Sequence, residues 1–325
     1  MIDFRYHLVS IVAIFLALAV GIIMGTTLLQ EPAVELAKKT SDELTKTNGD
    51  LRTELDALRG REAGNDQFVL NQTPQLVAGN LQGQRVLLMD APGDSATYRE
   101  AQQQVIEQSG AVVSGRVSLS EKFFDPKSAG VIDGLVNTLK PASMSFSTSA
   151  SVYDKAAALL AATTLTADPS QANTVNPDTS AVLKSFETDS LLSTTDGDPN
   201  KRATMVVMFA PEKAFDGDNA PAQNDALVSL IGGLDQGAKG SALAGTAATA
   251  AVAGGTISAL RDDSDAAKRV SSVDTLDMPA GRVVVIYALR EQLAGKSGQY
   301  GIGTGASLFQ PVVPSASTSP TSSGG

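Results

Sequence analysis

The sequence of 325 residues predicts an N-terminal transmembrane helix and a parallel coiled coil, followed by an α/β domain with a mostly parallel sheet. Three observations lead to this fold class. The first is a stretch of apolar residues without charges near the N-terminus. The second is a run of leucines at heptad spacing directly after it. The third is an alternation of apolar strands and helices over the rest of the chain.

The apolar stretch covers residues 8–29 and reads LVSIVAIFLALAVGIIMGTTLL. A helix of this length crosses a hydrocarbon core of about 30 Å, and its few hydroxyl groups can bond back to the helix backbone. A cleavable signal peptide is the alternative, with its small-x-small site at 17–19. Cleavage there would leave the apolar VGIIMG at the mature N-terminus, so we expect an uncleaved anchor after a short cytoplasmic N-terminus of residues 1–7.

Charges beside the span give a weak orientation signal. Arg5 precedes the span and favours a cytoplasmic N-terminus, with the C-terminal domain extracytoplasmic, but Lys38 and Lys39 follow it. Within the span, Gly21 and Gly25 form a small-xxx-small pair that lets two membrane helices approach closely. A chance occurrence is the alternative, because glycine is common in membrane helices.

A heptad pattern indicates a coiled coil over residues 31–62. One seam position holds Val34, Ser41, Asn48 and Leu55, and the other holds Ala37, Leu44, Leu51 and Leu58. Leucine at the second position with asparagine at the first is typical of a parallel two-stranded coil, so a homodimer is expected. A single amphipathic helix packed on its own domain is the alternative, and Gly49 weakens the helix by about 1 kcal/mol. We expect Gly60 and Gly64 to end it.

Residues 65–310 are predicted to form an extracytoplasmic α/β domain. Continuous apolar runs, typical of strands covered on both faces, lie at 85–90, 111–117, 204–209 and 282–289 (RVVVIYAL). Helical stretches lie between them at 95–109, 131–139, 152–162, 180–188 and 222–234. This alternation predicts a mostly parallel sheet with right-handed crossovers. Residues 141–151 and 189–202 are predicted loops, residues 242–256 receive no assignment, and 311–325 are a predicted disordered tail.

Composition excludes several classes of function. The net charge of −10 disfavours a nucleic-acid partner, which needs a basic surface. The chain has no cysteine and a single histidine, His7, at the membrane edge, where we expect an interfacial polar residue. Nucleophilic catalysis by Ser-His-Asp or Cys-His and zinc sites built on histidine are therefore absent from the globular part. We expect no catalytic residue, no cofactor and no enzymatic activity.

Three polar stretches are candidate sites. Asp90 and Asp94 follow the first strand, where α/β folds bind ligands, and a cation site competes there with the commoner loop or capping role. The glycine-rich 301–305 (GIGTG) superficially resembles a phosphate loop, but it does not lie between a clear strand and a helix. The aspartates of 261–265 (RDDSD) are expected to form a solvated turn.

Several stretches together resemble one protein family. They are the N-terminal MIDFRYHLVSIVAIFLALAVGIIMG, the leucine coil, RVLLMD, SGAVVSGRVSLSEKF and the ending SSVDTLDMPAGRVVVIYALREQLAGKSGQYGIGTGA. They resemble the actinobacterial family named for the mycobacterial copper transport protein B, and the resemblance covers nearly the whole chain. The chain is also similar to a corynebacterial cell-separation protein of that family, which implies a coiled-coil partner of a second protein and a role in controlling cell-wall hydrolases.

The residues of this chain favour one of these two implied functions over the other. An outer-membrane copper channel needs a closed barrel or several spans, whereas this chain offers one apolar helix and strands that read as buried runs. Soft sulfur ligands suit copper(I), but Met205 and Met208 point to opposite faces of one strand, and Met89 and Met278 lie far away in sequence. Core packing is the expected role of all four methionines, and copper enters only through the resemblance.

The sequence therefore predicts a dimeric, single-pass protein of the cell membrane that works as a non-enzymatic interaction module, and the resemblance implies a role in cell separation and control of wall hydrolysis. The expected partners are a second copy, the lipid bilayer and a membrane or cytoplasmic cell-separation protein. The alternative is a copper-efflux component of the envelope that limits intracellular copper, located in the outer membrane as the family label implies.

Overall fold

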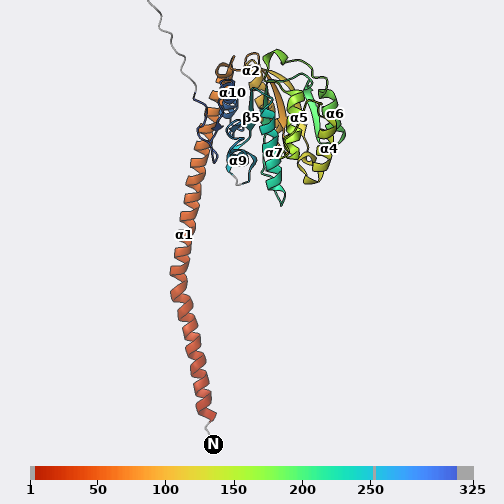
Figure 1. The fold of residues 1–325 in the computed structure, drawn as a ribbon. Helices are drawn as coiled ribbons and strands as arrows, with labels where there is room; N and C mark the ends of the chain where they lie inside the picture. Colours follow the sequence, from red (N-terminus) through yellow and green to blue (C-terminus); the bar gives the residue numbers. More distant parts are fainter. Residues whose placement is uncertain (1–3, 252–253, 313–325) are drawn as a thin grey trace, which may run out of the picture. The chain divides into compact units, whose positions relative to one another are not determined.

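The computed structural model describes residues 4–251 and 254–312, and the chain divides into two compact units, residues 1–65 and 66–325. Helix α1 runs from Phe4 to Val77 (Figure 1). The expectation that Gly60 and Gly64 end this helix is wrong. A glycine inside a helix costs only about 1 kcal/mol relative to alanine, and the residues beyond them have tertiary contacts that hold the helix.

The α/β domain, in the part of the chain described, holds a seven-stranded sheet in the order β3-β2-β1-β4-β5-β6-β7. Every neighbouring pair is parallel except β2 and β3, which are antiparallel. The strands are β1 Arg85–Asp90, β2 Val112–Leu119, β3 Leu192–Gly197, β4 Met205–Phe209, β5 Gly240–Ala244, β6 Ser271–Val273 and β7 Gln299–Tyr300. The mostly parallel α/β fold predicted from the sequence is confirmed.

Helices connect the strands and cover both faces of the sheet. They are α2 Ala96–Gln108, α3 Glu121–Phe124, α4 Ala129–Leu139, α5 Val152–Thr164, α6 Thr179–Thr188, α7 Ala220–Asp235, α8 Ala247–Ala251, α9 Thr256–Asp262 and α10 Pro279–Leu293. Two short 3₁₀ turns lie at Pro126–Ser128 and Pro169–Gln171. The five predicted helical stretches all correspond to observed helices, and the predicted strands at 85–90, 111–117 and 204–209 correspond to β1, β2 and β4.

Two hydrophobic layers enclose the sheet. On one face, Leu87 and Met89 of β1 pack with α4, α5, α6 and α7. On the other face, Val86 and Leu88 pack with α2, α10 and Val77 at the end of α1, and Figure 1 shows these two groups of helices on opposite sides of the strands. Because neighbouring strand residues point to opposite faces, the continuous apolar run of β1 is explained by this double covering.

The predicted strand at 282–289 is wrong, because these residues lie within helix α10. Valine and isoleucine favour strands, which made RVVVIYAL read as one. Pro279 supplies the first turn of the helix instead. Val284, Val285 and Ile286 are all buried, so burial on several sides, not strand pairing, accounts for the unbroken apolar run.

The prediction of a loop over residues 189–202 is wrong in part. This region contains β3, which pairs with β2, although residues 141–151 form the expected loop without helix or strand. The unassigned region 242–256 contributes the end of β5, helix α8 and the start of α9. Of the predicted tail at 311–325, residues 313–325 lie outside the described residues.

Candidate functional site

The first candidate is the apolar part of α1. Among the described residues, one helical stretch is long and apolar enough to cross a membrane: Arg5 to Thr26, 22 residues with a mean hydropathy of 2.8, none of them buried. The hydroxyl of Thr26 donates to the carbonyl oxygens of Ile22 at 2.9 Å and Ile23 at 3.1 Å, as a hydroxyl does in a membrane helix. His7 lies in this stretch and is exposed. The geometry is consistent with a membrane anchor.

The predicted coiled-coil seam lies on the next part of the same helix. Its leucines at 44, 51, 55 and 58 are between 48% and 66% exposed. Ala37, Ser41 and Asn48 are exposed as well, and the side chain of Val34 lies outside the described residues. An added Cβ at Gly21 or Gly25 meets nothing within 4 Å. The seam and the glycine pair stay predictions about a second copy of the chain.

The second candidate is the carboxyl edge of the sheet beside β1. The chain passes from β1 to β2 on one side and later returns to β4 on the other side. Parallel α/β folds bind ligands at such a reversal. Here the strand ends are tied together, because Ala91 N–H donates to the carbonyl of Phe209 at 3.0 Å and Glu212 N–H to that of Gly93 at 2.8 Å. A hollow of about 650 Å³ remains beside this tie, lined by Pro92, Gly93, Glu121, Glu212 and Phe215 among others.

Asp90 and Asp94 both contact one guanidinium at this edge. Nη1 of Arg99 in α2 lies 2.8 Å from Asp94 Oδ2 and 3.3 Å from Asp90 Oδ2. Ser118 in β2 donates to Asp90 Oδ2 at 2.7 Å. Loss of hydration and then the neighbouring charge of Asp90 raise the pKa of Asp94 to about 6. Burial also raises the pKa of Asp90. These aspartates form an ion-pair cluster with α2, and neither is the capping residue considered from the sequence, since Ser95 holds that position.

The glycine-rich 301–305 is a structural loop wrapped around a buried ion pair. Asp274, which follows β6, is fully buried and accepts hydrogen bonds from Ile302 N–H at 2.8 Å and Gly303 N–H at 2.9 Å. Arg261 of α9 donates to the same carboxylate at 2.8 Å. A phosphate loop needs free backbone N–H groups, and here two of them are occupied by Asp274. The superficial resemblance to a phosphate loop is thereby explained.

The 301–305 loop also requires its glycines. Gly301 adopts φ +128°, a conformation that L side chains rarely adopt, and a Cβ there would lie 1.8 Å from Asp274 Oδ1. A Cβ on Gly303 would lie 2.5 Å from that of Ala250. The motif therefore encodes close packing of the loop on Asp274.

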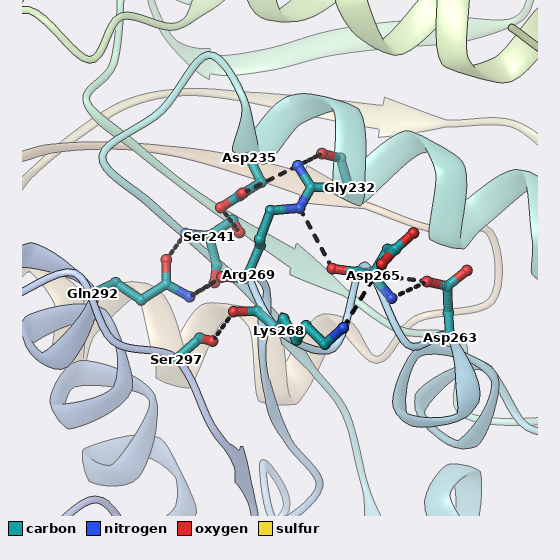
Figure 2. A network of polar contacts seen from close by, with 10 residues as sticks. Gly232, Asp235, Ser241, Asp263, Asp265, Lys268, Arg269, Gln292 and Ser297 are labelled. Atoms are coloured by element: carbon teal, nitrogen blue, oxygen red, sulfur yellow. Dashed lines mark hydrogen bonds and ion pairs between the residues drawn. The ribbon is translucent and has the colours of Figure 1, made fainter.

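The prediction of a solvated turn over the RDDSD stretch is only partly correct, because Arg261 and Asp262 end helix α9 and Arg261 is buried against Asp274. Residues 263–265 are exposed and lead into the turn, where Figure 2 shows Asp263 and Asp265. Asp263 Oδ1 accepts the N–H of Asp265 at 3.0 Å and that of Ala266 at 2.8 Å. Nearby, Arg269 reaches Asp235 at 3.8 Å. The turn borders a polar groove of about 810 Å³ between α5, α7 and α9. In the described part of the chain, no three His, Cys, Asp or Glu side chains are grouped to hold a metal ion.

The methionines behave as the strand geometry predicts. Met205 and Met208 pack into the layers on opposite faces of the sheet, and Met89 is buried in the layer with Met208. Met278 is half-buried directly before α10. Sequence reasoning missed Arg99, Ser118, Arg261 and Asp274. The only signal for Asp274 was its position in SSVDTLDMPAG, one of the stretches that carry the resemblance.

In the part of the chain that the structure describes, the fold and these sites define a protein with one candidate membrane helix and an α/β domain whose strand ends are joined by hydrogen bonds beside a hollow. A comparison with family models matches residues 1–311 to the family described as "Copper transport outer membrane protein, MctB". The chain belongs to this family, as its resemblance indicated.

Relatives with curated names agree with this membership. The chain is 28% identical over 327 residues to proteins named "Copper transporter MctB" from Mycobacterium tuberculosis (strain ATCC 25618 / H37Rv) and from Mycobacterium bovis. The alignment covers 94% of this chain and 98% of each relative. A protein of the same name from Mycobacterium leprae (strain TN) is 28% identical over 328 residues. The family is named for transport and not for an enzymatic activity.

Proposed function

We propose that this protein is a membrane-anchored, non-enzymatic component of copper transport in the cell envelope and that it limits intracellular copper. The observation that carries the proposal is the family match over residues 1–311, with relatives named copper transporters along almost their full length. The apolar helix from Arg5 to Thr26 supports an anchored protein. This proposal adopts the copper alternative in preference to cell separation as the main function.

Within that function, we expect the chain to act by contact with other polypeptides. Cysteine is absent from the sequence, and the one histidine lies in the apolar part of α1. The methionines of the sheet fill its two packing layers, where their sulfurs have apolar neighbours. The methionine sulfurs of the sheet strands are thus committed to the core, and Met24, which is exposed, lies in the apolar part of α1. An anchor, an exposed leucine seam and an α/β domain are the parts that an assembly component needs.

A second copy of the chain is the proposed partner of the exposed seam. Burying one leucine side chain stabilises a complex by about 1.5–3 kcal/mol, so four exposed leucines at heptad spacing favour association. Leu51→Pro removes a helix hydrogen bond and clashes with the preceding turn. We expect this variant to sediment as a monomer in detergent, while Arg52→Glu, beside the seam, stays dimeric. A dimeric Leu51→Pro protein would remove the coiled-coil argument.

The copper proposal is tested in the organism that encodes the chain. We expect a deletion strain to accumulate more cell-associated copper, measured by mass spectrometry, and to grow more poorly on copper but not on zinc. The full chain restores both properties, and a chain lacking residues 1–29 does not. Unchanged copper content and copper tolerance in the deletion strain would refute the proposal.

Control of cell separation and wall hydrolysis is the second candidate. The resemblance to a corynebacterial cell-separation protein implies it, and the exposed seam of α1 supports it because a regulator of hydrolases acts through partner proteins. Chained cells with normal copper content in the deletion strain would select this candidate. Microscopy detects the chained cells. If chaining occurs only in cells with raised copper content, the role in cell separation is secondary to the copper defect.

A further inference from the structure

Five charged side chains meet beneath α2 at the carboxyl ends of β1 and β2. Asp90 ends β1, Asp94 follows it, Arg99 lies in α2, Arg116 in β2 and Asp196 in β3. Arg116 lies 3.4 Å from Asp196, and the side chains of Asp90 and Asp94 are only 2% and 10% exposed. The Asp196 side chain is 59% exposed, so water screens its pair with Arg116. In the buried part of the cluster, two carboxylates share the one guanidinium of Arg99, which leaves one excess negative charge there.

The hydrogen bonds of this cluster are incomplete. Nη1 of Arg99 approaches three carboxylate oxygens: Asp94 Oδ2 at 2.8 Å, Asp94 Oδ1 at 3.1 Å and Asp90 Oδ2 at 3.3 Å. A guanidinium nitrogen of this kind has two hydrogens, so it cannot serve three acceptors well. Among the described residues, the buried Oδ1 of Asp90 has no hydrogen-bond donor. The site therefore lacks one donor and has one surplus negative charge.

A single proton corrects both deficits. Protonation of one carboxylate removes the surplus charge and adds an O–H donor to the cluster, as in other pairs of neighbouring acids. Arg116 and Asp196 form their own pair nearby, and Gln103 of α2 accepts from Arg116 at 2.6 Å. The electrostatic environment agrees, since burial and the charge of Asp90 raise the pKa of Asp94 to about 6.

We propose that the pair of Asp90 and Asp94 takes up one proton in mildly acidic surroundings and that this proton rearranges the loop between them. The proton comes from water and binds the carboxylate of Asp94, and no other bond is made or broken. Arg99 then pairs chiefly with Asp90, which keeps its charge. The repulsion between the two carboxylates disappears, so the protonated loop is the more tightly held form.

This proton site is connected to the surface of the domain. Gly93, within the loop, accepts the N–H of Glu212 at 2.8 Å. Gly93 and Glu212 both line the hollow of about 650 Å³ at the strand ends, together with residues 213–219. A change in the 91–94 loop therefore reaches the 211–219 loop through a direct hydrogen bond, and acidification alters the surface that a partner would meet.

Hydrogen–deuterium exchange of the full chain in detergent tests the proposal. After correction for intrinsic exchange rates, we expect peptides from 91–99 and 211–219 to exchange about tenfold more slowly at about pH 5 than at about pH 7.5. Asp94→Asn supplies the donor at every pH, so it is expected to exchange slowly at both values. Asp262→Asn, an exposed carboxylate on α9, keeps the wild-type response.

Two results would overturn the inference. One is equal protection of both loops at the two pH values in the wild-type chain. The other is a pH response that persists in Asp94→Asn. If that variant does not fold, a measurement on the wild-type chain alone still tests the proposal. Infrared difference spectra should show a protonated carboxyl group that appears at mildly acidic pH. Titration of all carboxylates only near their ordinary pKa would refute the proton site.

Discussion

Two aspartates at the same edge of the sheet show how differently one residue type can be used. Asp90 ends β1 and Asp274 follows β6, and both are almost completely buried. Each faces an arginine from a helix. Arg261 lies 2.8 Å from Asp274, whereas Arg99 lies 3.3 Å from Asp90 and is shared with Asp94. Both sites thus contain a buried aspartate and an arginine from a helix, but the two carboxylates are paired to different degrees.

The difference lies in hydrogen-bond satisfaction. Both oxygens of Asp274 accept hydrogen bonds, from Ile302 N–H and from Gly303 N–H with Arg261. Asp90 has one oxygen paired with Ser118 and Arg99, and its other oxygen has no donor among the described residues. A buried carboxylate that is fully paired holds the fold, whereas burial raises the pKa of Asp90, which is only partly paired.

Asp274→Ala should have the largest effect. It leaves Arg261 buried without its carboxylate and frees two N–H groups of the glycine loop, so we expect a loss of about 4 kcal/mol in the free energy of unfolding. Urea unfolding, followed by the near-ultraviolet signal of the tyrosines, measures it. Asp90→Ala should lose far less at neutral pH, because Asp94 keeps Arg99 paired. Equal losses would contradict the comparison.

Gly301→Ala should have the next largest effect on the free energy of unfolding. The new Cβ would collide with Asp274 Oδ1, and alanine does not readily adopt φ +128°. We expect a loss of about 3 kcal/mol in the same urea experiment. Gly295→Ala is the matched control, since Gly295 also has a positive φ but open space around its Cβ position. If both variants lose the same stability, backbone strain alone explains the effect and the contact with Asp274 does not.

Much of the fold could be predicted because local patterns agree with tertiary burial. The strand RVLLMD and the helix at 96–108 follow from apolar runs and stop signals, and both are observed. The strand predicted at 282–289 failed because β-branched residues also fill a helix that is buried on several sides. Strand β5, GSALA, has no strong strand residues, so only its pairing with β4 and β6 defines it.

The apolar stripe of α1 also shows the limit of prediction from local sequence patterns. Leu51 and Leu58 are exposed, whereas Val77 near the end of the helix is fully buried in the layer with α10. Heptad spacing predicts that an apolar stripe has a partner but not which surface supplies it. For residues 66–77 the partner is the chain's own domain, where Tyr287 donates to the carbonyl of Leu76 at 3.2 Å. For the seam leucines the partner stays a prediction.

The candidate site at the strand ends was half predictable. Its position after β1 follows from the parallel fold, so Asp90 and Asp94 were identified. Arg116, Ser118 and Asp196 come from strands whose pairing with β1 requires the sheet order. The bond from Gly303 to Asp274 joins positions 29 residues apart, and no local pattern encodes such a contact.

The unfolding free energy should depend on pH through Asp94. Its pKa is raised from 3.8 to about 6 in the folded chain, so the folded state binds a proton more tightly than the unfolded state. The resulting stabilisation is fully present below about pH 4 and is lost as the pH rises through about 6, a change of roughly 3 kcal/mol at most. Urea unfolding across this range measures it. Asp94→Asn should remove this component, and a wild-type slope in that variant would contradict the assignment.

Ser118→Ala should have the smallest effect, and it tests whether the pairing of Asp90 differs from that of Asp274. The hydroxyl donates to Asp90 at 2.7 Å, and its removal leaves the charged carboxylate with Arg99 alone. We expect a loss of about 1 kcal/mol at neutral pH, and less at acidic pH, where a shared proton supplies a donor. Ser193→Ala is the matched control, because Ser193 faces Ser118 in the β2–β3 pairing and is exposed. An effect of Ser118→Ala that is independent of pH would mean that this hydroxyl only fills space, and Asp90 would then resemble Asp274 after all.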